Sequence, residues 1–377
     1  MVRAASSGIA WPYWLPLRPD LKGISPYGAP QIEGVIALNT NENPFELPAE
    51  VVAAISSKIA EGLKTLNRYP DRDALELRAK LAAYITASTG VEVSADNIWA
   101  ANGSNEILQT LFLACGGAQN IALGFTPSYS VHPLIAQITK TPWVAGSRSE
   151  HFVIDIAAAK KLIAEKNPKL VFLTTPNNPS GTLTSVDEIK ELAQAAEKVD
   201  ALLIVDEAYA EFSRETSAVT LIEQFPHVVV VRTMSKAFAF AGARLGYLVA
   251  HPAVVNAALI TRLPYHLSSL VQAAASVALD FRDRLRSEVE TLISERERVA
   301  SAISEVGMKA EASEANFILF SGFSGESHDV WQFFLDRGIL IRDNGLRGYL
   351  RVTIGTPEEN DRFIAALREL ALPDTSK

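Results

Sequence analysis

Short apolar runs alternate with longer amphipathic stretches through the first two thirds of the chain. The continuous runs are residues 121–123, 170–173, 202–205 and 228–231, and residues 97–101 form a fifth run before a Gly-Ser turn. Stretches of a dozen or more residues with helical spacing separate them. A strand that is apolar at every position is typical of a parallel sheet with helices on both faces. The pattern therefore predicts an α/β fold with a mostly parallel sheet.

Helical periodicity fills most of the remaining sequence up to residue 305. We expect helices near residues 48–62, 72–88 and 252–262, and one long helix over about 270–305 that is highly charged on one face. Residues 242–249 read as a further strand. The long helix is the natural bridge to a second domain.

The last hundred residues change character, because their apolar positions alternate with polar ones. Residues 316–320, 339–342 and 349–354 have the alternation of antiparallel strands, with helices expected near 327–337 and 357–371. The pattern predicts a small α+β domain.

Three segments follow from these patterns. Residues 1–47 are rich in Pro, Gly and Asn without clear periodicity, so we expect an arm that packs on the small domain and the active site. Residues 48–265 would form the large domain and residues 266–377 the small C-terminal domain.

The composition and charge of the chain exclude several classes of binding partner. The chain has 377 residues, 48% of them apolar and 21% charged, and a formal net charge of −8, so we expect a globular protein without a nucleic-acid partner. Its one cysteine, Cys115, excludes an internal disulfide, and no pairing among its six histidines predicts a metal site. No apolar stretch reaches the roughly 20 residues of a membrane helix, and no signal peptide is evident, so we expect a cytoplasmic protein without a membrane partner.

Polar residues with complementary chemistry stand where the predicted strands end. Asp206 ends the run 202–205, Asn178 follows the run 170–173, and Lys236 follows the run 228–231. Ligands of open parallel sheets bind beyond the carboxyl ends of the strands. An amine, a carboxylate and a polar group at one edge are what pyridoxal phosphate requires: a Schiff-base partner, a partner for the pyridine nitrogen and a partner for the ring oxygen.

The other parts of such a site are also present. Tyr209 and Asn178 could both bond the ring oxygen, although Asn178 lies in a Pro-Asn-Asn-Pro-Ser-Gly sequence and could equally be a turn residue. Lys236 lies in an apolar stretch, where an ammonium must be paired or neutralised, and imine formation would neutralise it. Asp206 alone would more often be a helix cap or an ion-pair partner.

A phosphate would need several donors. Ser104 and Asn105 open a predicted helix whose N-terminus offers free amides, and Ser235 and Arg244 would add a hydroxyl and a guanidinium. For Ser104 an ordinary N-cap is an equally good interpretation. Tyr129 could stack on the pyridine ring, although a core position is the commoner fate of a tyrosine.

With these motifs the chain resembles the fold-type I pyridoxal-phosphate enzymes, and among them the class II aminotransferases of the histidinol-phosphate type. The resemblance runs from about residue 18 to residue 370. The matching segments are Leu38-Asn39-Thr40-Asn41-Glu42-Asn43-Pro44, Asn67-Arg68-Tyr69-Pro70-Asp71, Gly103 to Glu106, Pro176 to Gly181, Asp206 to Tyr209, Ser235 to Phe238, Gly242 to Tyr247 and Leu350 to Gly355.

The resemblance implies a role for each residue. Lys236 would be the Schiff-base lysine, Asp206 the pyridinium partner, Tyr209 and Asn178 the ring-oxygen partners, Tyr129 the stacking ring, and Ser104, Asn105, Ser235 and Arg244 the phosphate cradle. Tyr69 would reach the cofactor phosphate of the neighbouring subunit, so the resemblance implies a homodimer with shared sites. Tyr27 in the arm and Asn178, with Arg342 and Arg351 of the small domain, would bind substrate.

Two positions depart from the family pattern: Asn105 stands where an acidic residue is common, and Ala243 where leucine is frequent. The implied reaction moves an amino group from glutamate to imidazole acetol phosphate and gives histidinol phosphate. Motifs around the cofactor leave open an aromatic amino-acid aminotransferase and a phosphothreonine decarboxylase. A non-catalytic pyridoxal-phosphate-binding regulator would normally carry a DNA-binding module, and the sequence shows no basic helical domain.

Overall fold

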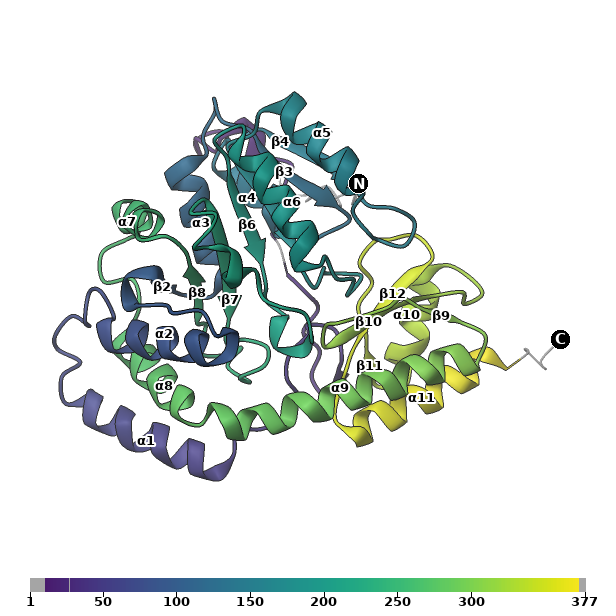
Figure 1. Ribbon diagram of the computed structural model, residues 1–377. Coiled ribbons are helices and arrows are strands. Elements are labelled where there is room, and N and C mark those ends of the chain that lie inside the picture. The colour runs from purple at the N-terminus through teal and green to yellow at the C-terminus, as the bar shows by residue number, and fades with distance from the viewer. Residues whose placement is uncertain (1–10, 27, 373–377) are drawn as a thin grey trace.

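The computed structural model describes residues 11–26 and 28–372, arranged around one large and one small sheet (Figure 1). The large sheet has seven strands in the order β2-β8-β7-β6-β5-β3-β4. Its strands are β2 (Ile98–Ala101), β3 (Ala122–Thr126), β4 (Trp143–Ser147), β5 (Leu170–Thr174), β6 (Leu202–Asp206), β7 (Val228–Thr233) and β8 (Gly246–Val249). The α/β class and the apolar strands predicted from the sequence are confirmed.

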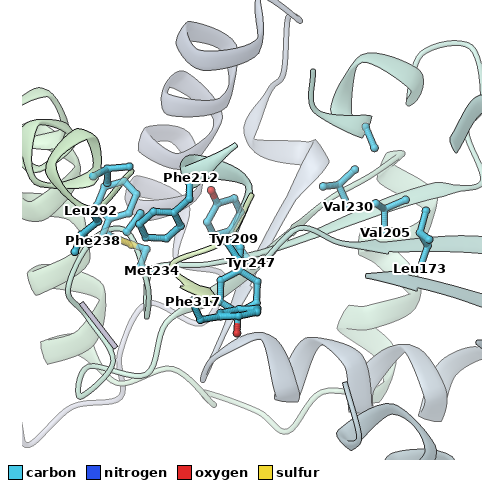
Figure 2. Packing of buried hydrophobic residues seen from close by; sticks show 14 of the residues in the cluster. Leu173, Val205, Tyr209, Phe212, Val230, Met234, Phe238, Tyr247, Leu292 and Phe317 are labelled. Carbon is cyan, nitrogen blue, oxygen red and sulfur yellow. The ribbon is translucent and has the colours of Figure 1, made fainter. Parts of the chain in front are cut away.

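Alternate side chains of each central strand enter the cores on opposite faces of the sheet. In β7, Val228 and Val230 belong to one apolar cluster, while Val229 and Val231 belong to the other, and all four are fully buried. Figure 2 shows Val230 beside Val205 and Leu173 of the neighbouring strands. Burial on both faces explains why these runs are apolar at every position.

Helices cover both faces of this sheet. The helices of this part are α1 (Ala49–Leu63), α2 (Leu75–Thr89), α3 (Ser104–Cys115), α4 (Val131–Ile138), α5 (Ile156–Lys166), α6 (Val186–Glu197), α7 (Pro252–Thr261) and α8 (Ser269–Asp280). Local sequence fixes several of their starts. In α6, for example, Ser185 and Glu188 form a reciprocal capping box.

The strands run in one direction with one exception. β3, β4, β5, β6 and β7 pair in parallel, whereas β8 is antiparallel to both β7 and β2. Two reversals restore the direction, so β2 points the same way as β7. The carboxyl ends of six strands therefore lie at one edge, where β8 begins.

The expected strand 242–249 is correct only from Gly246 onward. Residues 242–245 form a turn in which Arg244 has a left-handed φ of 57°. Apolar composition suggested a strand here, but the turn is needed to reverse the chain between β7 and β8.

The expected single helix over 270–305 is also wrong. It consists of α8 and α9 (Arg282–Glu305), which are separated at Phe281. Because α8 packs against α1 and α2, we propose that the boundary between the two domains lies at this break rather than near residue 266. α9 then runs along the molecule to the small sheet and lies beside α11 (Pro357–Ala371) (Figure 1).

The small sheet is antiparallel, with the order β12-β10-β9, and α10 (Ser327–Asp336) packs against it. Its strands are β9 (Lys309–Ala310), β10 (Phe317–Ser321) and β12 (Tyr349–Thr353). The expectation for 339–342 needs correction, because β11 (Ile339–Leu340) pairs in parallel with β1 (Ile36–Ala37) of the arm. An alternating pattern gives strand and burial but does not give the partner strand. Within the described part of the chain, no helix is long and apolar enough to cross a membrane.

Candidate active site

The carboxyl edge of the large sheet gathers the polar residues singled out in the sequence. Asp206 ends β6, paired with Thr174 at the end of β5 and Val231 near the end of β7. Asn178 follows β5 by a short loop and Lys236 follows β7 by a short loop. Parallel pairing at the same register is what brings residues so distant in sequence to one place.

Asp206 is buried at the end of β6, with 3% of its surface exposed. One of its oxygens accepts the backbone N–H of Ala208 at 3.3 Å, and Nε2 of buried His132 lies 3.3 Å from the other. The rings of His132 and Tyr129 meet edge to face with centroids 5.5 Å apart. A carboxylate removed from water in this way needs a cationic or N–H partner, and a protonated pyridine nitrogen would supply one.

Lys236 presents its amine to the backbone of the arm. Nζ donates to the carbonyl of Thr40 at 2.9 Å, and the residue is only partly buried. Burial, with a contribution from the Arg351 guanidinium, lowers the pKa of the Lys236 amine from 10.5 to about 8. About one tenth of the amine is therefore neutral, and nucleophilic, at pH 7, far more than for an ordinary lysine.

The start of α3 and the turn before β8 form one cradle. Ser104 is the first helical residue rather than the cap, since Gly103 holds the cap position with φ 80°. A Cβ on Gly103 would lie 2.7 Å from Nη2 of Arg244, so the missing side chain lets the guanidinium approach the helix start. Nη1 of Arg244 also donates to Oγ of Ser235 at 3.4 Å. The Ser235 hydroxyl, the Arg244 guanidinium and the free backbone amides at the start of α3 therefore lie close together. Several donors grouped in this way can bind an anion.

Tyr129 and Asn105 are joined to the same cradle. The Tyr129 hydroxyl donates to Oδ1 of Asn105 at 3.1 Å, which links the segment just before α4 to the first turn of α3. In this structure Asn105 therefore contacts the expected stacking residue directly.

Tyr209 is 5% exposed, and its ring meets Phe317 of the small sheet edge to face at 5.1 Å. Figure 2 shows the two rings close together, with Phe212 next to Tyr209. The Tyr209 hydroxyl accepts a hydrogen bond from Nδ2 of Asn41 at 2.9 Å. The small sheet therefore packs directly against a residue expected to hold the cofactor.

Arg351 reaches the site from the small sheet. Its Nη1 donates to Oδ1 of Asn178 at 2.6 Å and its Nη2 to the carbonyl of Asn39 at 2.7 Å. A pair of backbone hydrogen bonds, both 2.9 Å, places Arg342 opposite Arg351. Both predicted anion-binding residues are thus neighbours, and Arg351 contacts the large domain directly.

One expected site residue, Tyr69, faces away from this edge, and another cannot be placed. Tyr69 is 79% exposed and stacks on Tyr265 with ring centroids 4.3 Å apart. Tyr27 lies outside the described residues. The remaining candidates are assembled by one chain.

Sequence reasoning missed His132 and Asn41. His132 follows Tyr129 by one helical turn, which was a usable signal once Tyr129 had been singled out. Asn41 was noticed only as part of a matching segment. No local pattern shows that its side chain meets Tyr209, 168 positions away.

The residues fit pyridoxal phosphate. A buried carboxylate, a partly neutral amine and an anion cradle lie along one edge in the order of the pyridine nitrogen, the aldehyde carbon and the phosphate. Among the residues that the structure describes, no cluster of His, Cys, Asp and Glu could hold a metal ion.

Comparison with known proteins points to the same chemistry. The family described as aminotransferase class I and II matches residues 33–367. A histidinol-phosphate aminotransferase of Corynebacterium glutamicum (strain R) is 54% identical over 357 residues, covering 94% of this chain and 96% of that protein. One of Mycobacterium sp. (strain JLS) is 52% identical over 357 residues, or 94% of each chain. The fold matches the crystal structure of histidinol-phosphate aminotransferase from Sinorhizobium meliloti in complex with pyridoxal-5'-phosphate, with a TM-score of 0.79 and 24% identity over 89% of this chain and 90% of that one.

Proposed function

The chain belongs to the aminotransferase class I and II family, and from this premise we propose that it is a pyridoxal-phosphate-dependent transaminase of histidine biosynthesis. Its reaction moves an amino group from L-glutamate to imidazole acetol phosphate and gives L-histidinol phosphate and 2-oxoglutarate. The observation that carries the proposal is the alignment of Asp206, Lys236 and the Arg244 cradle along one sheet edge. The relatives that share half of the sequence support the choice of substrate.

Pyridoxal phosphate, when bound, supplies a carbonyl that carries the amino group and a ring that accepts electrons. Asp206 would keep a proton on the ring nitrogen, and Tyr209 and Asn178 would stabilise negative charge on the ring oxygen. Ser104, Asn105, Ser235 and Arg244 would hold the phosphate, with Tyr129 against the ring face.

Lys236 acts on the substrate as general base and acid. Once its amine is free, Nζ takes the proton from Cα of glutamate, and in the second half-reaction it returns a proton to Cα of the product. Its pKa of about 8 suits both directions near neutral pH. The carbonyl of Thr40 accepts a hydrogen bond from Nζ and so helps to hold the amine in position.

Arg351 and Arg342 would bind the anionic end of the substrate. A guanidinium donates hydrogen bonds equally well to a carboxylate or to a phosphate, so Arg351 can bind glutamate in one half-reaction and the phosphorylated substrate in the other. Its hydrogen bonds to Oδ1 of Asn178 and to the carbonyl of Asn39 hold the guanidinium in position.

We also propose a homodimer in which Tyr69 contributes to the partner's site. Three large residues are exposed in the single chain: Tyr69 (79%), Leu263 (73%) and Ile260 (84%). Their exposure supports the proposal that a partner subunit covers them in the dimer. Location in the cytoplasm remains a prediction from the sequence.

Half-reactions test the substrate. The loaded protein is mixed separately with histidinol phosphate, glutamate and phenylalanine, and the absorbance of the resting cofactor is followed. We expect rapid loss with the first two and a much slower loss with phenylalanine. Fast conversion by phenylalanine alone would assign the protein to aromatic amino acids, and no change with any of them would reject transamination.

Mixing two inactive variants tests the shared site. Lys236→Ala and Tyr69→Ala homodimers are each expected to be strongly impaired. After exchange of subunits, heterodimers hold one intact site, so activity should return to about one quarter of the wild-type value. No recovery, with heterodimers demonstrated by mass, would show that Tyr69 does not act across the interface.

A further inference from the structure

Three consecutive residues of the arm contact three parts of the site. The carbonyl of Asn39 accepts from Arg351, the carbonyl of Thr40 accepts from Lys236, and Nδ2 of Asn41 donates to the hydroxyl of Tyr209. The anion-binding arginine, the amine and the phenol are thus linked through one short piece of backbone.

Asn41 is buried and is held by hydrogen bonds from both its backbone and its side chain. It is 2% exposed, and its backbone has a left-handed φ of 57°. Its N–H donates to Oγ1 of Thr353 at 3.0 Å, and its carbonyl accepts from Nδ2 of Asn316 at 3.1 Å. Both partners belong to the small domain, so the contact of that domain with the arm fixes the position of Asn41.

The orientation of the Asn41 amide follows from donor and acceptor counting. Oγ1 of Thr353 accepts the backbone N–H of Asn41, and its own proton donates to Oδ1 of Asn41 at 3.1 Å. In this arrangement the amide oxygen faces Thr353, and the NH₂ group faces Tyr209. With the amide donating, the Tyr209 oxygen is the acceptor in this bond, and its single proton points elsewhere.

We propose that Asn41 is a positioning residue that makes Tyr209 a hydrogen-bond donor toward the ring oxygen of the cofactor. The inference rests on the proposed function and assigns part of it to a residue of the arm. A chain of donors from Thr353 through Asn41 to Tyr209 polarises each successive bond, which strengthens the last donor. A stronger donor stabilises the negatively charged ring oxygen.

The pH titration of the loaded, substrate-free protein measures this effect. A donor at the ring oxygen lowers the pH at which the cofactor absorbance changes, because it stabilises the form that has lost its proton. Asn41→Ala should raise this midpoint by about half to one pH unit, the size expected for loss of one hydrogen bond. Tyr209→Phe should raise it by at least as much.

A double variant separates positioning from general damage. In the Tyr209→Phe background, Asn41→Ala should cause no further shift, because the group through which it acts is gone. Asn43 provides the matched control, since it lies on the same segment but donates to the carbonyl of Ala237 at 3.2 Å. Asn43→Ala should leave the midpoint unchanged, and Thr353→Ser, which keeps the hydroxyl, should also leave it unchanged.

An unchanged midpoint in Asn41→Ala, in protein that takes up the cofactor normally, would overturn the inference while leaving the proposed function intact. Additive shifts in the double variant would also overturn it, because Asn41 would then act on the cofactor by another route. Failure of the wild-type protein to take up pyridoxal phosphate would instead reject the proposed function.

Discussion

Replacing Arg351 by glutamine should make the Lys236 amine harder to deprotonate in the cofactor-free protein. Burial is the main cause of the fall in the pKa of Lys236 from 10.5 to about 8, and the Arg351 guanidinium is the next. Glutamine keeps a neutral amide donor but removes the positive charge. The midpoint should therefore move upward from about 8 without reaching the ordinary value of 10.5.

The size of the effect follows from the two pKa values. At pH 7 an amine with a pKa of about 8 is about 10% neutral, whereas an ordinary lysine at 10.5 is about 0.03% neutral, so the fold increases the reactive form about 300-fold. The pKa of the Lys236 amine in the folded protein, about 8, lies below the unfolded value of 10.5. The neutral amine is therefore the main form of folded Lys236 above about pH 8. The rate of cofactor capture should rise with pH up to that point and then level off.

The assay is the rate at which the cofactor-free protein takes up pyridoxal phosphate, measured by absorbance across about pH 6 to about pH 10. Arg351→Lys keeps the charge and should retain the wild-type midpoint. Arg342→Gln is the matched control, because Arg342 faces Arg351 through backbone bonds and is not among the causes that lower the pKa of Lys236. A wild-type midpoint near 10, or one that does not move in Arg351→Gln, would refute the reasoning.

Three further predictions concern charge, packing and stability. Asp206→Asn should lower the rate of transamination by about 10² or more with the cofactor still bound, measured by steady-state kinetics, because the ring nitrogen loses its anionic partner. Gly246→Ala should weaken retention of pyridoxal phosphate in equilibrium dialysis, because the added Cβ would overlap the backbone nitrogen of Ser104 at the start of the cradle. Arg232→Met should lower the free energy of unfolding in urea by about 3–5 kcal/mol, because it leaves the buried carboxylate of Glu207, now 2.7 Å from the guanidinium, without its partner.

Local sequence was enough to predict the strand ends and the chemistry placed there. A run such as Val228–Val231 is apolar at every position only when both faces are buried, and that implies a parallel sheet whose carboxyl edge collects Asn178, Asp206 and Lys236. The predicted strand at 242–249 failed because apolar composition cannot distinguish a strand from the turn that precedes it. The predicted helix over 270–305 failed because helical periodicity continues across the break at Phe281.

The sequence by itself determined which chemical groups are present and which strands bring them to a common edge. Strands buried on both faces are apolar at every position, and the helices between them repeat every 3.6 residues. The sequence also determined the family. Only the tertiary structure decided that Arg351 meets Asn178 and that Asn41 meets Tyr209, across 173 and 168 positions. These contacts depend on how the small sheet and the arm pack against the large sheet, and no periodicity along the chain encodes that packing.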